Sequence, residues 1–351
     1  MPRVARAPHR GGPLGWLRES TEPVCGRAPM ARRALRAIIG STATEELSVY
    51  RKIIVGWDGT EQARDALALA TRLRAPDGTV VAACVYPDPG GRARAGDRGI
   101  IDAAAETAAE ARRNTQEDWL STRAVPGHSP AHGLHVLIEH EGADLVVVGS
   151  SHRGELRQVM AGSGGHRLLT GSPCPVAVAP KGFHERADGI GMVAVAYDGS
   201  QEADNALHEG ASLAVGLGAR LKLIGVVPPL KIWFGDGAFA PPPPPSEELL
   251  RTRGEAWEKT LDEGIESVAN QQVVATRELR SGIPSAELAA AARQGVDLMV
   301  TGSRNYGPLR RVMIGSTAVQ LMSEAPCPVI VIPRGAATPS AAREPQAAAT
   351  A

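Results

Sequence analysis

Two short segments each place an acidic residue, a glycine and a hydroxyl residue directly after an apolar run. Residues 51–60 read RKIIVGWDGT and residues 191–200 read GMVAVAYDGS, so Asp58-Gly59-Thr60 and Asp198-Gly199-Ser200 follow predicted buried strands. A carboxylate in this position can accept hydrogen bonds from a ligand. The same residue types also form turns and cap helices. The residues alone leave both interpretations open.

A second repeated pair of segments could bind an anion. Residues 144–163, DLVVVGSSHRGELRQVMAGS, align without a gap with residues 297–316, DLMVTGSRNYGPLRRVMIGS. Backbone amides and the dipole at a following helix start attract a phosphate, and glycine allows its close approach. The candidate residues at the two ends of these loops are Gly149, Gly162 and Ser163 in the first copy and Gly302, Gly315 and Ser316 in the second.

No set of residues with the types needed for catalysis is evident. His152 has no visible acid or nucleophile partner, and Arg153 and Arg304 are phosphate donors or solvated surface residues. The four cysteines form no C-x-x-C pair, which excludes a dithiol motif and gives no support for a zinc site. We expect no enzyme activity, a reducing cytoplasmic location, and buried, unreactive thiols at Cys174 and Cys327.

The elements that position these residues alternate between strand and helix, and the pattern occurs twice. Runs such as VVAACV and LVVVG are apolar at successive positions, which indicates parallel strands buried on both faces. The predicted strands are 51–57, 79–85, 121–125, 144–149, 175–179, 192–197, 219–226, 274–280, 297–301 and 328–332. The predicted helices are 61–74, 101–120, 130–141, 156–171, 201–217, 246–269, 284–294 and 310–324. The fold class is therefore α/β, with two tandem doubly wound domains.

Length and charge agree with two domains that bind a small molecule. The chain has 351 residues, and its 38 Lys and Arg balance 38 Asp and Glu, so no global field favours nucleic acid. No apolar run reaches the roughly 18 residues that a membrane span requires. We expect domains at 49–181 and 191–334, with a disordered extension at 1–48 and a disordered tail at 335–351.

Two segments outside the repeat have alternative interpretations. Residues 1–48 form a solvated extension, with a possible basic helix over 30–39, or result from a start site upstream of a true start at Met30. The second copy carries an insertion, WFGDGAFAPPPPPSEE, whose Pro241–Pro245 predicts a polyproline II spacer or a ligand for an SH3-like partner.

The sequence resembles the universal stress protein family in its tandem form over nearly all of residues 51–334. The resemblance rests on the strand-Asp-Gly-Ser/Thr start, the G-x12-G-S segment and the terminal Pro-Cys-Pro-Val strand. It implies a five-stranded parallel sheet of order 3-2-1-4-5 in each domain. It also implies ATP, with Mg, in the crevice between strands one and four, with the aspartates and the strand-two backbone near Val85 and Val227 on the adenosine side.

The second glycine of the family's G-x2-G-x9-G-S/T pattern is missing in both copies. His152 and Asn305 occupy that position, and Gly154 and Gly307 follow two residues later. The expected function is nucleotide sensing in stress response or signalling, without fast turnover. A slow ATPase and a nucleotide-free scaffold are the alternatives. The strands that end at residues 179 and 332 are expected to pair as an intrachain pseudo-dimer, and a homodimer and an unknown regulatory protein are further candidate partners.

Overall fold

The computed structural model describes residues 50–87, 98–115, 117–150, 164–229, 246–303 and 316–334, all within the unit Leu47–Ala351. The predicted extension, the tail, the polyproline segment and most of both anion-loop segments lie outside the described residues.

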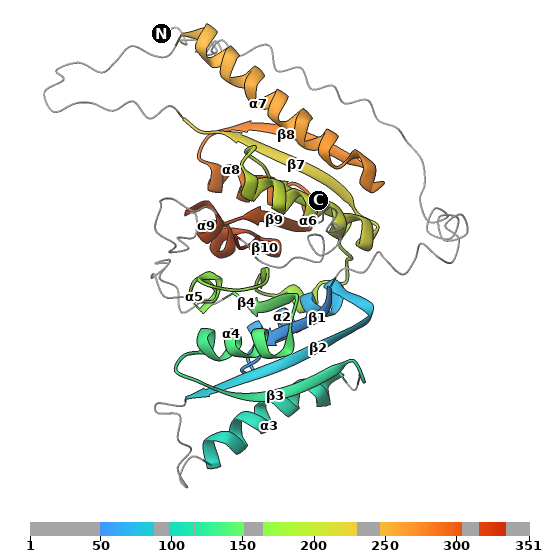
Figure 1. Ribbon diagram of the computed structural model, residues 1–351, viewed down its shortest axis with the longest axis vertical. Helices are drawn as coiled ribbons and strands as arrows, with labels where there is room; N and C mark the ends of the chain where they lie inside the picture. Colours follow the sequence, from blue (N-terminus) through green and yellow to red (C-terminus); the bar gives the residue numbers. More distant parts are fainter. Residues whose placement is uncertain are drawn as a thin grey trace, which may run out of the picture. The chain divides into compact units, whose positions relative to one another are not determined.

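Strands and helices alternate as predicted (Figure 1). The strands are β1 (Tyr50–Gly56), β2 (Arg74–Pro87), β3 (Leu120–Gly127), β4 (Leu145–Gly149), β5 (Val176–Ala179), β6 (Met192–Ala196), β7 (Arg220–Val227), β8 (Ala275–Ser281), β9 (Leu298–Gly302) and β10 (Val329–Ile332). The α-helices are α2 (Glu61–Leu73), α3 (Arg98–Thr115), α4 (Pro130–Glu141), α5 (Gly164–Leu169), α6 (Gln201–Leu217), α7 (Glu247–Ser267), α8 (Pro284–Ala292) and α9 (Ser316–Glu324), and η1 (Phe183–Glu185) and η2 (Ala269–Gln271) are short 3-10 helices.

The strand order confirms the predicted topology of each copy and adds a connection between them. The order is β3-β2-β1-β4-β5-β10-β9-β6-β7-β8, so each half reads 3-2-1-4-5 and is parallel throughout. The difference from the expected pair of sheets is that the halves form one continuous sheet of ten strands.

The connection is an antiparallel pairing of β5 with β10, as the sequence predicted for these strands. Val178, Ala177 and Val176 lie opposite Val329, Ile330 and Val331. Every residue of both strands is buried. Because each of these strands would otherwise be a sheet edge, the pairing covers two apolar edges that would favour aggregation.

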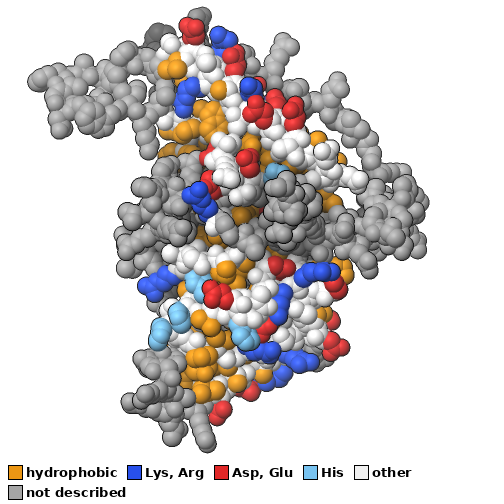
Figure 2. Space-filling model, viewed as in Figure 1, with side chains coloured by type: hydrophobic (Ala, Val, Ile, Leu, Met, Phe, Trp, Pro, Cys, Tyr) orange, Lys and Arg blue, Asp and Glu red, His pale blue; other side chains and the backbone are white. Residues whose placement is uncertain are grey.

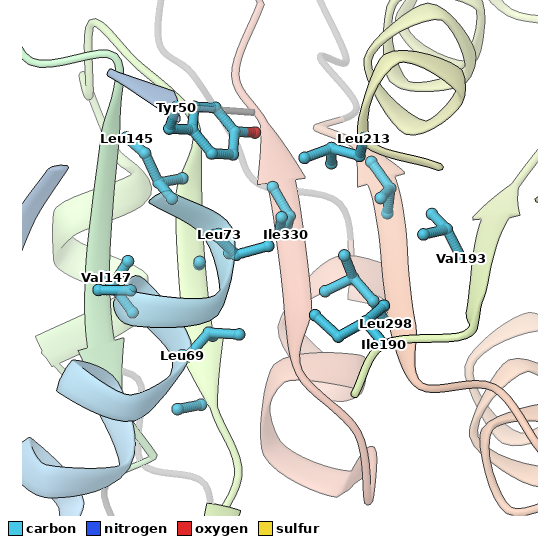
Figure 3. Close-up of a cluster of buried hydrophobic side chains, with 14 of the residues drawn as sticks. Tyr50, Leu69, Leu73, Leu145, Val147, Ile190, Val193, Leu213, Leu298 and Ile330 are labelled. Carbon is cyan, nitrogen blue, oxygen red and sulfur yellow. The ribbon is translucent and has the colours of Figure 1, made fainter. Parts of the chain in front are cut away.

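Two buried clusters lie on the two faces of the sheet, and each includes residues of both halves. One contains residues of α2, α3, α6 and α7, and the other contains residues of α4, α5, α8 and α9. Figure 3 shows part of the first cluster, where Tyr50 and Leu73 lie on one side of Ile330 and Leu213 on the other. Burial, and then the Glu209 carboxylate of α6, raise the pKa of Tyr50 well above its ordinary value. The halves therefore share one hydrophobic core on each face.

The surface of the described residues carries charges of both signs. Figure 2 shows basic and acidic side chains intermixed on the face in view, which fits the balanced composition. Among the helices of the described ranges, none combines the length and the apolar character that crossing a membrane requires.

Two element boundaries differ clearly from the prediction. Helix α3 ends at Thr115, because Leu120 is already fully buried in β3 beside Val80. Strand β2 begins at Arg74, directly after α2, because Tyr50 pairs with Arg74 ahead of a register shift. Of the predicted helices 156–171 and 310–324, the structure describes only α5 and α9.

An aspartate in front of the fourth strand fixes the register of each half. Asp144 accepts backbone hydrogen bonds from Arg51 (2.8 Å) and Lys52 (3.0 Å), and Asp297 accepts them from Gly191 and Met192 (both 2.9 Å). Because these donors begin β1 and β6, each carboxylate holds the first strand beside the fourth.

The linker between the two predicted domains, residues 182–190, is packed against α2. The Asp65 carboxylate of α2, only 1% exposed, accepts hydrogen bonds from Gly182 N (3.0 Å) and His184 N (2.9 Å), and lies 2.6 Å from His184 Nδ1. Phe183 is buried under the Arg72 guanidinium. The Arg186 side chain donates to Pro326 O (2.7 Å) in the other half.

We predict that Asp65→Ala lowers the free energy of unfolding by about 3 kcal/mol, because it leaves buried donors without an acceptor. Urea unfolding measures the change. The control is Asp77→Ala, which breaks an exposed ion pair with Arg51 and should cost less than about 0.5 kcal/mol. Equal effects of the two substitutions would contradict the role given to Asp65.

Candidate functional site

The candidate residues of each half meet where the first and fourth strands end. Strand β1 lies between β2 and β4, and β6 lies between β7 and β9. The carboxyl ends of parallel strands share one edge of the sheet, where α/β proteins bind ligands at the switch in strand order. Asp58 and Gly149 therefore face one crevice, and Asp198 and Gly302 face its counterpart.

Each aspartate organises the turn that starts the next helix. Asp58 Oδ1 accepts from Thr60 N (3.1 Å) and Thr60 Oγ1 (2.6 Å), and Thr60 Oγ1 accepts from Ala63 N as the N-cap of α2. Asp198 and Ser200 repeat these contacts at 3.1 and 2.6 Å ahead of α6. The capping interpretation is thus realised in both halves, through one carboxylate oxygen of each aspartate.

The glycine between aspartate and hydroxyl residue is required by backbone geometry. Gly59 and Gly199 have φ values of +78° and +74°, a conformation that costs other residues strain. The turn they form carries each chain from the strand end directly into the helix.

Gly149 and Gly302 lack a side chain because a helix approaches too closely. A Cβ on Gly149 would lie 2.1 Å from the carbonyl oxygen of Gln62, and one on Gly302 would lie 2.4 Å from that of Glu202. The first turn of α2 or α6 therefore contacts the residue that opens each predicted anion loop. This contact brings the aspartate turn and the loop start together.

We predict that Gly149→Ala lowers the free energy of unfolding by about 3 kcal/mol, because backbone atoms must shift to admit the methyl group. The matched control is Gly254→Ala inside α7, where a Cβ would meet nothing within 4 Å. That change should stabilise the protein by up to about 1 kcal/mol. Denaturant titration of both variants tests the pair, and a Gly149→Ala variant as stable as the parent would refute the close contact.

Strand β2 extends past the end of β1 and exposes backbone groups to the crevice. Trp57 N donates to Ala83 O (2.9 Å), so the backbone of Val85, two residues further along, also faces the β1 side. In the second half Tyr197 N donates to Ile224 O (3.0 Å), and the equivalent position is Val226. Val227 points the other way, since its carbonyl accepts from Gly282 N beside β8.

The side chains agree with this register. Val85 packs against the cluster on the α4 and α8 face of the sheet, and Val226 is a member of that cluster. Val85 and Val226 are therefore the structural equivalents, and the predicted Val227 is displaced from the crevice by one residue.

The aromatic residues that follow β1 and β6 each donate a hydrogen bond to a helix. Trp57 Nε1 donates to Thr107 O of α3 (2.7 Å), and Tyr197 OH donates to Asp204 Oδ1 of α6 (2.7 Å). Burial, and then the Asp204 carboxylate, raise the pKa of Tyr197. Both aromatic side chains are buried in the cluster beneath α3 and α7, so the turns rest on the core.

Cys84 lies in β2 next to Val85, where burial and then the Asp58 charge raise its pKa. The thiols of Cys84, Cys174 and Cys327 are free, and burial raises the pKa of both Cys174 and Cys327 to about 12. The described residues hold no group of three or more His, Cys, Asp or Glu arranged for a metal ion.

We predict that Cys174 and Cys327 resist iodoacetamide in the native protein at pH 8, because their raised pKa keeps the reactive thiolate scarce. Labelling should rise only as the pH approaches 12 or when urea unfolds the chain. Peptide mass spectrometry measures each position, with half-buried Cys84 as the internal comparison that reacts faster. Rapid native labelling of Cys174 at pH 8 would contradict this prediction.

The remaining predicted site residues are described only in part. Gly162, Ser163 and Gly315 lie outside the described residues, as do His152, Arg153, Arg304 and Asn305. Ser316 is the first residue of α9, and Gly164, next to Ser163, is the first residue of α5.

Four further residues at the crevices could not be identified from the sequence pattern. Gln62 and Glu202 contact the loop glycines, and Ser150 and Ser303 follow those glycines as buried polar residues. The only signal in the sequence was that these residues follow a predicted strand end or a predicted helix start. That signal does not show which backbone atoms are in contact.

The fold and site define a class of protein with two doubly wound α/β domains, each with a crevice at its strand switch. The profile of the universal stress protein family matches residues 49–180 and again residues 191–333. The chain belongs to the universal stress protein family in its tandem form.

Individual relatives agree with this assignment. A universal stress protein of Mycobacterium tuberculosis is 26% identical over 219 residues, which cover 60% of this chain and 72% of the relative. One from Thermus aquaticus is 32% identical over 141 residues, or 40% of this chain and 96% of the relative. The crystal structure of a universal stress protein from Archaeoglobus fulgidus covers 82% of this chain and 98% of its own, at 18% identity and a TM-score of 0.56, and so shows the same fold.

Proposed function

We propose that the chain binds ATP in these crevices and acts as a nucleotide sensor in stress response or signalling. The observation that carries the proposal is the contact of Gly149 with Gln62, repeated by Gly302 with Glu202. In both halves it brings the aspartate turn to the start of the loop that the sequence assigns to phosphate.

The described residues fit the adenosine part of such a ligand. The backbone of Val85, and of Val226 in the second half, faces the crevice beyond the last pairing of the first strand. Oδ1 of each aspartate accepts hydrogen bonds within the turn, which holds the carboxylate at the strand end. A backbone donor and acceptor beside a carboxylate suit the edge of an adenine or a ribose.

We propose binding without fast turnover. Phosphate contacts position ATP, whereas hydrolysis also needs a group that activates water. We expect Mg to enter on the phosphates, as this ion usually keeps several waters and few protein ligands. The free thiols support a reducing cytoplasm, and the intermixed charges support a partner other than nucleic acid. A homodimer would have to use a surface other than β5 and β10, which already pair within the chain.

We predict that Mg-ATP raises the melting temperature, and that Asp58→Asn with Asp198→Asn weakens ATP binding about tenfold. The amide keeps an oxygen for the turn but removes the charge that assists a ligand hydrogen bond. Calorimetry measures the affinity, and Asp77→Asn is the control for loss of one exposed carboxylate.

Two results would overturn parts of this proposal. If protein purified under native conditions releases no nucleotide on acid extraction and shows no thermal shift with Mg-ATP, the chain is a nucleotide-free scaffold. If labelled ATP is turned over by the parent and not by the double variant, the crevice is that of a slow ATPase.

A further inference from the structure

We propose that the two crevices are unequal, and that the first half takes the anionic nucleotide while the Glu202 carboxylate disfavours it in the second. This inference rests on the proposed nucleotide binding and specifies which half performs it.

The first turns of the two equivalent helices carry different charges. In α2 the turn contains Glu61, Gln62 and Arg64, with Glu61 Oε1 2.6 Å from Arg64 Nη1. In α6 the aligned residues are Gln201, Glu202 and Asp204. The α2 turn is formally neutral, whereas the α6 turn carries two carboxylates.

The carboxylate of Glu202 belongs to the residue that touches the loop glycine. A Cβ on Gly302 would lie 3.0 Å from the Cβ of Glu202, and one on Gly149 would lie 2.7 Å from that of Gln62. The same position beside the loop therefore holds a neutral amide in the first half and a carboxylate in the second. Repulsion between this carboxylate and a nucleotide phosphate disfavours the second site.

Arg334 contacts both Glu202 and Ser303 in the second half. Its Nε lies 3.6 Å from Glu202 Oε1, and its backbone N–H donates to Ser303 Oγ (3.1 Å). The equivalent Ser150 Oγ is buried, and among the described residues it has no hydrogen-bond partner. The second half thus satisfies its own polar groups, whereas the first retains a hydroxyl that can still accept or donate.

The second turn is also more tightly covered. A Cβ on Gly199 would lie 2.7 Å from Thr260 Cγ2 of α7, whereas the nearest atom to one on Gly59 is Glu110 Oε2 of α3 at 3.4 Å. Asp58 is exposed, and Asp198 is half-buried. The neutral first turn of α2, the available Ser150 hydroxyl and the looser cover favour the first half for an incoming anion.

The test is calorimetry of the full chain with Mg-ATP, together with equilibrium dialysis of labelled ATP. We expect one tight site per chain, which Asp58→Asn weakens and Asp198→Asn leaves unchanged. Glu202→Gln, which copies Gln62, should tighten the second site about tenfold and bring the stoichiometry toward two. The reciprocal Gln62→Glu should weaken the first site by a similar factor.

The matched control is Glu255→Gln on α7. It also removes one negative charge, from an exposed ion pair with Arg251, and should change the affinity of neither site. Arg334→Gln is a second variant. It removes the positive charge that neutralises Glu202, so it should weaken ATP binding at the second site further. Thermal unfolding confirms that each variant folds. Two equal sites in the parent, or no response to Glu202→Gln, overturns the inequality alone. Absence of any ATP binding overturns the proposed function as well.

Discussion

The antiparallel pairing of β5 with β10 is the interaction on which the rest of the structure depends. Both strands are buried along their whole length, so either copy alone would expose an apolar edge. Joined, they extend each hydrophobic cluster through both halves, and Tyr50 of the first half lies against Glu209 of the second. The linker also connects the two halves. Asp65 of α2 binds its backbone, and its Arg186 side chain donates a hydrogen bond to Pro326 O of the second half. The two crevices are therefore parts of one sheet.

The fold could be predicted well from the sequence because its strand and helix patterns are strong and occur twice. Successive apolar residues identify the buried strands, and the repeat identifies the domain. Local pairing was harder to predict. Val227 was chosen in place of Val226 because both are valines in the same apolar run of β7. Only the direction of their backbone hydrogen bonds, toward β6 or toward β8, separates them. The end of α3 was placed too late because Leu120 suits either a helix or a strand until its neighbour Val80 is known.

The two readings of the aspartates turn out to be compatible. Oδ1 of Asp58 accepts hydrogen bonds from the backbone and the hydroxyl group of Thr60. These bonds fix the orientation of the carboxylate at the end of β1. A ligand-binding carboxylate has to be held in place before the ligand arrives, so a turn that orients it also prepares it. Residue types alone could not separate the roles, because an Asp-Gly-Ser/Thr turn is compatible with both.

The fold constrains Gly149 and Gly302 much more strongly than the residues that touch them. Both glycines are required because a backbone carbonyl of the next helix lies where a Cβ would be. The contact uses the carbonyl and Cβ of Gln62 or Glu202, atoms that nearly every residue type has. The close contact therefore sets no requirement on the remainder of that side chain, which is an amide in Gln62 and a carboxylate paired with Arg334 in Glu202. The close contact tolerates either a neutral or a charged side chain, so two copies with the same fold can carry different charges beside the same glycine.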